Sequence, residues 1–291
     1  MYYTLAGEGP DKWASAWLLK RKISAGSTIS VVSEREIKEQ NPEFTFDVPG
    51  SPFTRNQHQT TFEVLLQNHE TTDRATKRLA LILNDIEVNL WRANRYPESE
   101  TVEQAFRLLQ RRYDIGKTPI NCYLGFFDTI ASAIDNPSTT FPTPSELVPN
   151  ESCSIVEKPR NKPFVREMEL SEILTKIADG EKVVFIDSRE PSEYEESHIP
   201  GAINLKIRDV ATANLDELKK ANLVVAYCVK DFRGFEMARQ LHKHGVSQAV
   251  IAKPYGLRGW IDSGLPVTKP NETIALDAFN EIKRIAQDQL D

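Results

Sequence analysis

The hydrophobic positions after residue 164 follow two different periods. Short apolar, β-branched runs at 183–187, 223–227 and 248–252 predict buried strands. Residues 168–179 and 235–245 instead place apolar side chains at the helical spacing i, i+3, i+4, and residues 190–197 suit a short helix. Strands that alternate with helices at this spacing predict an α/β fold, with a parallel sheet covered by helices on both faces.

The first part of the chain is richer in helical patterns. Apolar stripes predict helices within 11–23, 71–94 and 98–116, and the β-branched run at 28–34 predicts one strand. Residues 137–163 hold six prolines and no sustained hydrophobic period, which predicts an extended linker. We therefore expect a helix-rich domain at 1–136, a Pro-rich linker at 137–163 and an α/β domain at 164–291.

Composition and charge narrow the classes of protein. A chain of 291 residues suits two domains, and 40% hydrophobic with 27% charged residues is ordinary for globular proteins. No apolar run reaches the ~20 residues of a membrane span, and the first residues lack a signal-peptide layout, so we expect no membrane association. A net charge of −6 argues against binding to nucleic acid. Three scattered cysteines are too few for a disulfide scaffold or a CxxC metal site, so a reducing cytoplasm is expected.

One cysteine, Cys228, stands where a predicted strand passes into a helix. Ligands of parallel α/β sheets bind beyond the carboxyl ends of the strands, and Cys228 follows such an end. The helix that begins near 232–234 offers unpaired N–H groups and a positive dipole end, which favour a thiolate or a bound anion. Lys230 and Arg233 add positive charge and Asp231 adds negative charge. Judged from position alone, two interpretations of Cys228 have equal weight: a reactive thiol, or a small apolar side chain buried at the end of a strand.

Three segments in order resemble the rhodanese sulfurtransferases: FIDSREPSEYEESHIPGAINL at 185–205, YCVKDFRG at 227–234 and KPYGLRGWIDSGLPV at 253–267. The resemblance implies a rhodanese-like sheet and a catalytic Cys228. This residue would take up a sulfane sulfur as a persulfide and pass it to a thiol or to cyanide. Arg233 and the loop amides would hold the negative sulfur, and no cofactor is implied. The candidate substrate-binding residues are Val229, Lys230, Asp231, Phe232, Gly234, Asp187 and Arg189.

Two details of this region refine the expectation. Four residues separate Cys228 from Arg233, which is the sulfur-transfer length, whereas the phosphatases that share the rhodanese fold need one more. Asp231 stands where single-domain rhodaneses commonly carry glycine. Aspartate tolerates a left-handed backbone, yet its charge would oppose dianionic thiosulfate as the donor. For Asp187 and Arg189, at the end of the first strand, an ion pair that braces the loop is the favoured interpretation.

Segments at 11–23, 46–50, 55–66 and 79–87 resemble the conserved domain of chromate-resistance B proteins, over about 1–135. The resemblance implies a polar site in this domain. The candidate residues are Lys12, Arg21, His58, Glu63, Asp85 and Glu87. Family members often have a histidine at the position of Asn84 and a cysteine near 59–61, and this chain has neither, so we expect no tightly held metal. We expect either a solvated polar cluster or an oxyanion site to which Lys12 and Arg21 supply the positive charge.

The predicted function is that of a cytoplasmic sulfurtransferase with a small-molecule sulfur donor and a thiol acceptor, linked to chromate or oxyanion resistance. The alternative is a sensor or binding protein. In that case the first domain would recognise an oxyanion or a metal, and the rhodanese fold would serve only as a scaffold.

Overall fold

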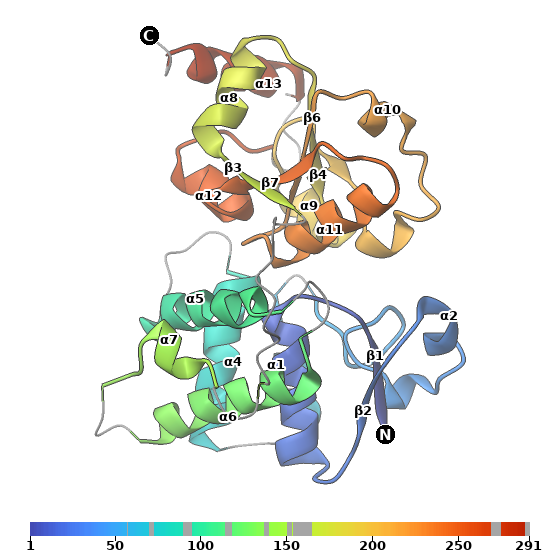
Figure 1. Cartoon of the computed structure of the whole chain (residues 1–291), viewed down its shortest axis with the longest axis vertical. Coiled ribbons are helices and arrows are strands. Elements are labelled where there is room, and N and C mark those ends of the chain that lie inside the picture. Colours follow the sequence, from blue (N-terminus) through green and yellow to red (C-terminus); the bar gives the residue numbers. More distant parts are fainter. Residues whose placement is uncertain are drawn as a thin grey trace. The chain divides into compact units, whose positions relative to one another are not determined.

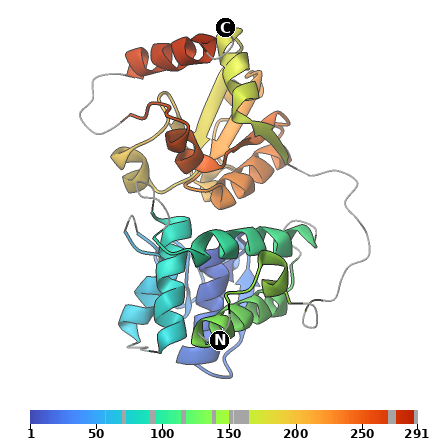
Figure 2. The same cartoon turned by 90° about the vertical axis from the view of Figure 1, so that its left-hand side faces the viewer.

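The computed structural model describes residues 1–56, 58–69, 73–89, 95–113, 118–136, 140–149, 153, 165–268 and 275–288. The chain forms two compact units, Met1–Asn161 and Lys162–Asp291. Figures 1 and 2 show a helix-rich first unit and a second unit built on a sheet. Among the described residues, no helix is both long and apolar enough to cross a membrane.

The first unit consists of helices and one small sheet. Strands β1 (Tyr2–Leu5) and β2 (Ile29–Val32) pair in parallel, and β2 confirms the predicted strand. The helical elements, in chain order, are α1 (Pro10–Leu18), the π-helix η1 (Leu19–Ile23), α2 (Glu34–Ile37), the 3₁₀ turn η2 (Pro42–Phe44), α3 (Thr61–Asn68), α4 (Arg74–Glu87), α5 (Glu98–Arg111), α6 (Ile120–Asp135) and α7 (Pro144–Leu147). The predicted helices at 11–23, 71–94 and 98–116 correspond to α1 with η1, to α4 and to α5. Residues 71–72, 90–94 and 114–116 of those predictions lie outside the described part.

Helix α1 lies at the centre of the first unit, because all nine of its residues are buried. It packs against α3, α4 and α6, and the Trp13 ring stacks on Tyr123 of α6 with centroids 4.4 Å apart. Helix α6 itself was not predicted. Its apolar residues occupy most of its circumference, so the 3.6-residue period that marks a surface helix is weak.

The second unit holds a five-stranded parallel sheet with strand order β3-β7-β6-β4-β5. Its strands are β3 (Arg166–Glu169), β4 (Val183–Asp187), β5 (Ile203–Asn204), β6 (Leu223–Tyr227) and β7 (Ala249–Lys253). Its helical elements are α8 (Leu170–Ala178), α9 (Pro191–Glu196), the 3₁₀ turn η3 (Ile207–Asp209), α10 (Asp216–Lys219), α11 (Phe232–Lys243), α12 (Gly256–Asp262) and α13 (Ala275–Asp288). The predicted α/β architecture is confirmed, and β4, β6 and β7 match the predicted strands.

Helices cover both faces of this sheet, as the alternation of side chains along β4 shows. Ile186 packs into the core that Met237 and Leu241 of α11 form, whereas the Phe185 ring lies against Trp260 of α12, 5.3 Å between centroids. Neighbouring residues of a strand point to opposite faces, so α11 and α12 lie on opposite sides. In the register of the sheet Asp187 pairs with Tyr227, which brings the carboxyl ends of β4 and β6 together.

The segment predicted as an extended linker contains a packed helix. Thr143 caps α7 through a capping box with Glu146, and Pro144 occupies the first turn. Leu147 and Val148 are buried, so this part of 137–163 belongs to the first unit. Proline is favourable in the first turn of a helix, so a high proline content does not by itself distinguish a linker from a helix start. Residues 137–139, 150–152 and 154–163 of the predicted linker lie outside the described part, so its domain boundaries stay a prediction.

The cysteines require a second correction. Cys122 of α6 and Cys153 form a disulfide, although the low cysteine count had argued against a disulfide scaffold. Both side chains are buried, and the Tyr113 hydroxyl lies 3.1 Å from Cys122 Sγ. The two cysteines are 31 positions apart in sequence. They come together because α7, which precedes Cys153, packs against α5 and α6. The expected reducing cytoplasm stays a prediction.

Candidate functional site

Cys228 lies at the carboxyl end of β6, in the short loop that leads into α11. Its side chain is only 2% exposed, and it is a thiol outside the disulfide. Asp231 is the residue before the first turn of α11 and adopts a left-handed conformation, with φ 70° and ψ 7°. This backbone turns the chain sharply, and α11 begins at Phe232, four residues after Cys228. That the helix start cradles the thiolate stays a prediction.

The segment that opens α12 fixes this loop from a second side. The Leu257 N–H donates to the Cys228 carbonyl over 2.8 Å, and the Arg258 N–H donates to the Val229 carbonyl over 3.1 Å. Gly256 has φ +67°, and a Cβ there would lie 2.2 Å from the Val229 carbonyl oxygen. Only glycine allows this approach, so Gly256 is a part of the site that the candidate residues did not include.

Asp231 connects the loop to the same segment. Its buried carboxylate accepts the Gly256 N–H over 2.8 Å and the Cys228 N–H over 3.3 Å. The predicted tolerance of aspartate for the left-handed backbone is confirmed. Its carboxylate therefore joins two loops that are 25 residues apart in sequence, a role that its position in the motif did not reveal.

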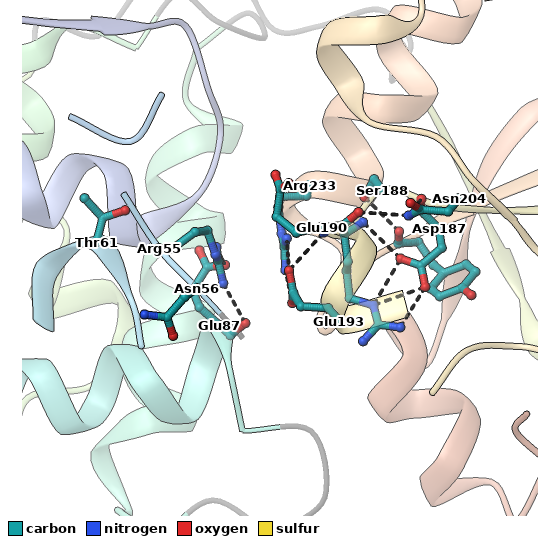
Figure 3. Close-up of polar contacts among 12 residues, drawn as sticks. Arg55, Asn56, Thr61, Glu87, Asp187, Ser188, Glu190, Glu193, Asn204 and Arg233 are labelled. Carbon is teal, nitrogen blue, oxygen red and sulfur yellow. Dashed lines mark hydrogen bonds and ion pairs between the residues drawn. The ribbon is translucent and has the colours of Figure 1, made fainter. Parts of the chain in front are cut away.

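Arg233 is held by a carboxylate from α9. Its Nη1 and Nη2 donate to Glu193 Oε2 and Oε1 over 2.9 and 3.0 Å, and both side chains are largely buried (Figure 3). Glu193 also accepts the Glu190 N–H in the capping box that starts α9, and Glu190 in turn pairs with Arg208. Sequence reasoning missed Glu193. Its capping-box spacing from Glu190 marks a helix start, but nothing local indicates that it reaches Arg233.

Asp187 and Arg189 form the predicted ion pair at the end of β4. Arg189 Nη2 lies 2.7 Å from Asp187 Oδ2, and the side chains are 2% and 0% exposed. Arg189 also donates to the Ser197 carbonyl, and the Asn204 amide donates to the carbonyl oxygens of Asp187 and Arg189. Figure 3 shows Asn204 beside Asp187. Burial alone would lower the pKa of Arg189, but the Asp187 carboxylate raises it. With these contacts the pair braces the loop after β4, and direct substrate binding by either residue is not favoured.

The remaining loop residues shape the surroundings of Cys228. Val229 and Phe232 are each 2% exposed, and Lys230 is half-buried. Gly234 allows α11 to lie close against β6, since a Cβ there would be 2.8 Å from the Tyr227 Cα. Burial, followed by the nearby Asp187 carboxylate, raises the pKa of Tyr227 well above its usual value, so this side chain stays a neutral hydroxyl that accepts the Ile199 N–H.

The first unit does not bring its predicted candidates into one site. Lys12 is buried, and its Nζ lies 2.7 Å from Asp47 Oδ2 and 3.1 Å from Thr4 Oγ1. Arg21 lies at the surface on η1 and forms a two-point ion pair with Asp128. Nine positions along α1 and η1 separate Lys12 from Arg21, and the two side chains have different carboxylate partners. Each of the two cations is paired with a carboxylate, and the oxyanion site to which both would contribute stays a prediction.

The other four candidates take part in different local contacts. Glu63 closes the capping box of α3 with Thr60, and Asp85 accepts backbone N–H groups of residues 95 and 96. His58 is exposed, and its carbonyl accepts the amide of Asn84, which also donates to Glu63. In the described part of the chain, no group of three or more His, Cys, Asp and Glu side chains could hold a metal. The expectation that the protein holds no metal stays a prediction.

A buried polar cluster lies instead around the start of α1. Asp11 accepts the Thr61 and Phe62 N–H groups at the start of α3, over 2.8 and 3.0 Å. Glu87, one of the six candidates, forms a 3.0 Å ion pair with Arg55 and lies near the Asp11 N–H (Figure 3). Burial raises the pKa of Asp11 to about 7, and the nearby Asp47 and Glu87 add to this effect against the opposing charge of Arg55.

The parallel sheet, the loop after β6 and the cysteine at its start define a rhodanese-type domain. Comparison with known families agrees, because residues 170–263 match the rhodanese-like domain and residues 2–134 match the C-terminal domain of ChrB. The chain therefore belongs to the proteins that join a ChrB C-terminal domain to a rhodanese-like domain, and this confirms both resemblances.

Two relatives that match the second unit are named as sulfurtransferases. A sulfurtransferase of Allochromatium vinosum is 27% identical over 107 residues, which cover 37% of this chain and 98% of the relative. A thiosulfate:glutathione sulfurtransferase of Saccharomyces cerevisiae is 33% identical over 94 residues, covering 28% of this chain and 67% of the relative. The crystal structure of the Alr3790 protein from Anabaena sp. is 21% identical, covers 42% of this chain and 91% of its own, and has a TM-score of 0.32. The rhodanese-like family match and the two named sulfurtransferases identify the second unit as sulfurtransferase-like.

Proposed function

We propose that the chain transfers a sulfane sulfur through a persulfide on Cys228. The supporting observation is a buried thiol between the carboxyl end of β6 and the start of α11, with Arg233 in the first turn of that helix paired to Glu193. The N–H groups at a helix start and the positive end of its dipole favour a thiolate and, afterwards, a negative persulfide.

The reaction has two balanced steps. In the first, the Cys228 thiolate attacks the outer sulfur of the donor. An S–S bond forms to the enzyme, the S–S bond of the donor breaks, and the leaving group departs with its electron pair. In the second, the thiolate of an acceptor, or cyanide, attacks the terminal sulfur of the persulfide and restores the Cys228 thiolate. Arg233 and the loop amides stabilise the negative terminal sulfur between the steps.

Mass spectrometry of the full chain after incubation with sulfur donors tests this function. We expect the mass of one added sulfur, located on Cys228, at close to one per chain, and removable by cyanide with formation of thiocyanate. Cys228→Ser should abolish both results, and Cys122→Ser, whose side chain lies in the first unit, should retain them. Thiocyanate formation at the full rate by Cys228→Ser would exclude the persulfide mechanism.

The alternative is a sensor or binding protein with a rhodanese scaffold, linked to chromate or another oxyanion. The stoichiometric persulfide separates the two functions, because a scaffold would not accumulate one. In the first unit, Lys12 and Arg21 are each paired with a carboxylate, so neither observation favours this alternative over sulfur transfer.

A further inference from the structure

The cations that surround the Cys228 loop are matched by carboxylates. Arg233 pairs with Glu193, and Arg258, whose N–H bonds the Val229 carbonyl, pairs with Asp262 at 2.8 Å. The buried Arg189 pairs with Asp187, and Lys230 and Asp231 contribute one charge of each sign within the loop itself. Four cations and four carboxylates give a formal sum of zero. The sum comprises Arg189, Lys230, Arg233 and Arg258 against Asp187, Glu193, Asp231 and Asp262.

One negative charge, the Asp231 carboxylate, lies within the Cys228 loop itself. Its Oδ1 lies 3.3 Å from the Cys228 backbone nitrogen, and the residue is 0% exposed. Water does not screen a charge in such a position, and its repulsion of another anion is stronger than at the surface. The Cys228 loop therefore already contains an anion of its own before any donor binds.

The two classes of donor place very different charges in this loop. When the Cys228 thiolate attacks thiosulfate, three negative charges share one transition state, because the sulfonate is bonded directly to the reacting sulfur. When it attacks the protonated persulfide of a thiol, R–S–SH, the total is one negative charge. The S–S bond of the persulfide breaks, the electron pair leaves on the R–S⁻ thiolate, and Cys228 carries the S–SH group. Surroundings with zero net charge stabilise the singly charged transition state of the persulfide reaction far better than the triply charged one of the thiosulfate reaction.

Access to the thiol favours the same class. Cys228 is 2% exposed between the equally buried Val229 and Phe232. A terminal sulfur on an alkyl chain is narrow enough to approach such a thiol, whereas the sulfonate of thiosulfate brings three oxygens along with the reacting atom. The persulfide of a small thiol can bring its terminal sulfur to Cys228 without the docking of a second macromolecule.

We propose that Asp231 and Glu193 are specificity-determining residues that direct the site to the persulfide of a small thiol and against thiosulfate. This inference rests on the proposed sulfur transfer through Cys228. Asp231 acts by its buried charge beside the nucleophile. Glu193 acts by neutralising the Arg233 guanidinium in the first turn of α11.

Steady-state kinetics of the full chain with glutathione persulfide and with thiosulfate test the selectivity. We expect kcat/KM to be at least about 100-fold higher for glutathione persulfide, the ratio that about two charge–charge contacts weakened by protein relaxation would give. Asp231→Gly suits the left-handed backbone and removes the charge, so it should raise the ratio of kcat/KM for thiosulfate to that for glutathione persulfide about 10-fold. The loss of the Cys228 and Gly256 N–H bonds affects both donors alike and cancels in this ratio. Glu193→Gln should act in the same direction. Asp262→Asn, which removes a carboxylate that is 56% exposed, is the matched control and should leave the donor ratio unchanged.

Two results would overturn the selectivity. One is a wild-type kcat/KM for thiosulfate equal to or above that for glutathione persulfide. The other is an equal gain for both donors in Asp231→Gly. Circular dichroism shows whether a variant is folded. If a variant is unfolded, the ratio of the two kcat/KM values of the wild-type protein still tests the selectivity. The mass of Cys228 separates the two failures: no added sulfur from either donor contradicts the proposed function, and efficient loading by thiosulfate contradicts only the selectivity.

Discussion

Breaking the buried ion pair at the end of β4 should strongly destabilise the second unit. Asp187→Asn keeps the size of the side chain and removes its charge, which leaves the Arg189 guanidinium, 2% exposed, without its carboxylate. Breaking a buried pair by removing one partner costs about 3–5 kcal/mol, because the remaining charge stays away from water. The amide of asparagine would in addition place a donor against the Arg189 donors.

An internal control comes from the surface of the same unit. Arg166 and Glu172 form an ion pair of the same 2.7 Å length, with side chains 63% and 45% exposed. Glu172→Gln should reduce the free energy of unfolding by less than about 1 kcal/mol, because water screens an exposed pair. The two substitutions remove the same chemical group, so the difference between them measures the effect of burial.

Urea denaturation followed by labelling of Cys228 is a suitable assay. The thiol is 2% exposed in the fold, so a maleimide reaches it on unfolding of this unit, and the mass of the labelled peptide identifies it. With an m-value of about 1.5 kcal/mol/M, a loss of about 3 kcal/mol lowers the urea midpoint by about 2 M. Equal midpoints for Asp187→Asn and Glu172→Gln would refute the reasoning.

Three further predictions concern single features of the two units. Gly256→Ala should reduce sulfur transfer by about 100-fold, because its Cβ would meet the Val229 carbonyl at 2.2 Å and displace the Cys228 loop. Gly264→Ala, at a similar positive φ with open space around it, should lose stability and keep the activity of the folded protein. Burial raises the pKa of Asp11 from 3.8 to about 7, so the folded state binds an extra proton between those values. The free energy of unfolding of the first unit should therefore fall as the pH rises from about 4 to about 7, and Asp11→Asn should flatten this slope in pH-dependent denaturation. Elemental analysis should find no transition metal at near one per chain, and a stoichiometric metal would contradict the ligand argument.

The sequence predicted best what depends on local pattern. β4, β6 and β7 are short apolar runs in a sheet buried on both faces, and α11 carries a clear stripe, so periodicity sufficed for all of them. The missed strand β3 lies at the edge of the sheet and reads Arg–Glu–Met–Glu, a charged composition that suits an edge and hides a strand. Its last residues were taken into the predicted helix at 168–179. Strand β5, at the other edge, has only two residues and no pattern to detect.

The site shows the same division between local and distant information. The position of Cys228 and the length of its loop could be derived from a strand end, a helix start and a motif. The partners that fix the loop could not, because Gly256 and Glu193 lie 25 and 40 residues from the side chains that they contact. No spacing rule selects Glu193 over its neighbours Glu195 and Glu196, and only the packing of α9 beside the loop does so.

The contact from α9 also changes the charge that a sulfur donor meets at the Cys228 loop. Counted along the loop alone, Lys230, Asp231 and Arg233 give a net charge of +1, which suits an anionic donor such as thiosulfate. In the folded protein Glu193 cancels Arg233, and the same loop becomes neutral. The charge that a donor meets is therefore set by a contact from another helix as much as by the loop sequence. It follows that two rhodanese loops with the same residues can select different donors when only one of them is faced by such a carboxylate.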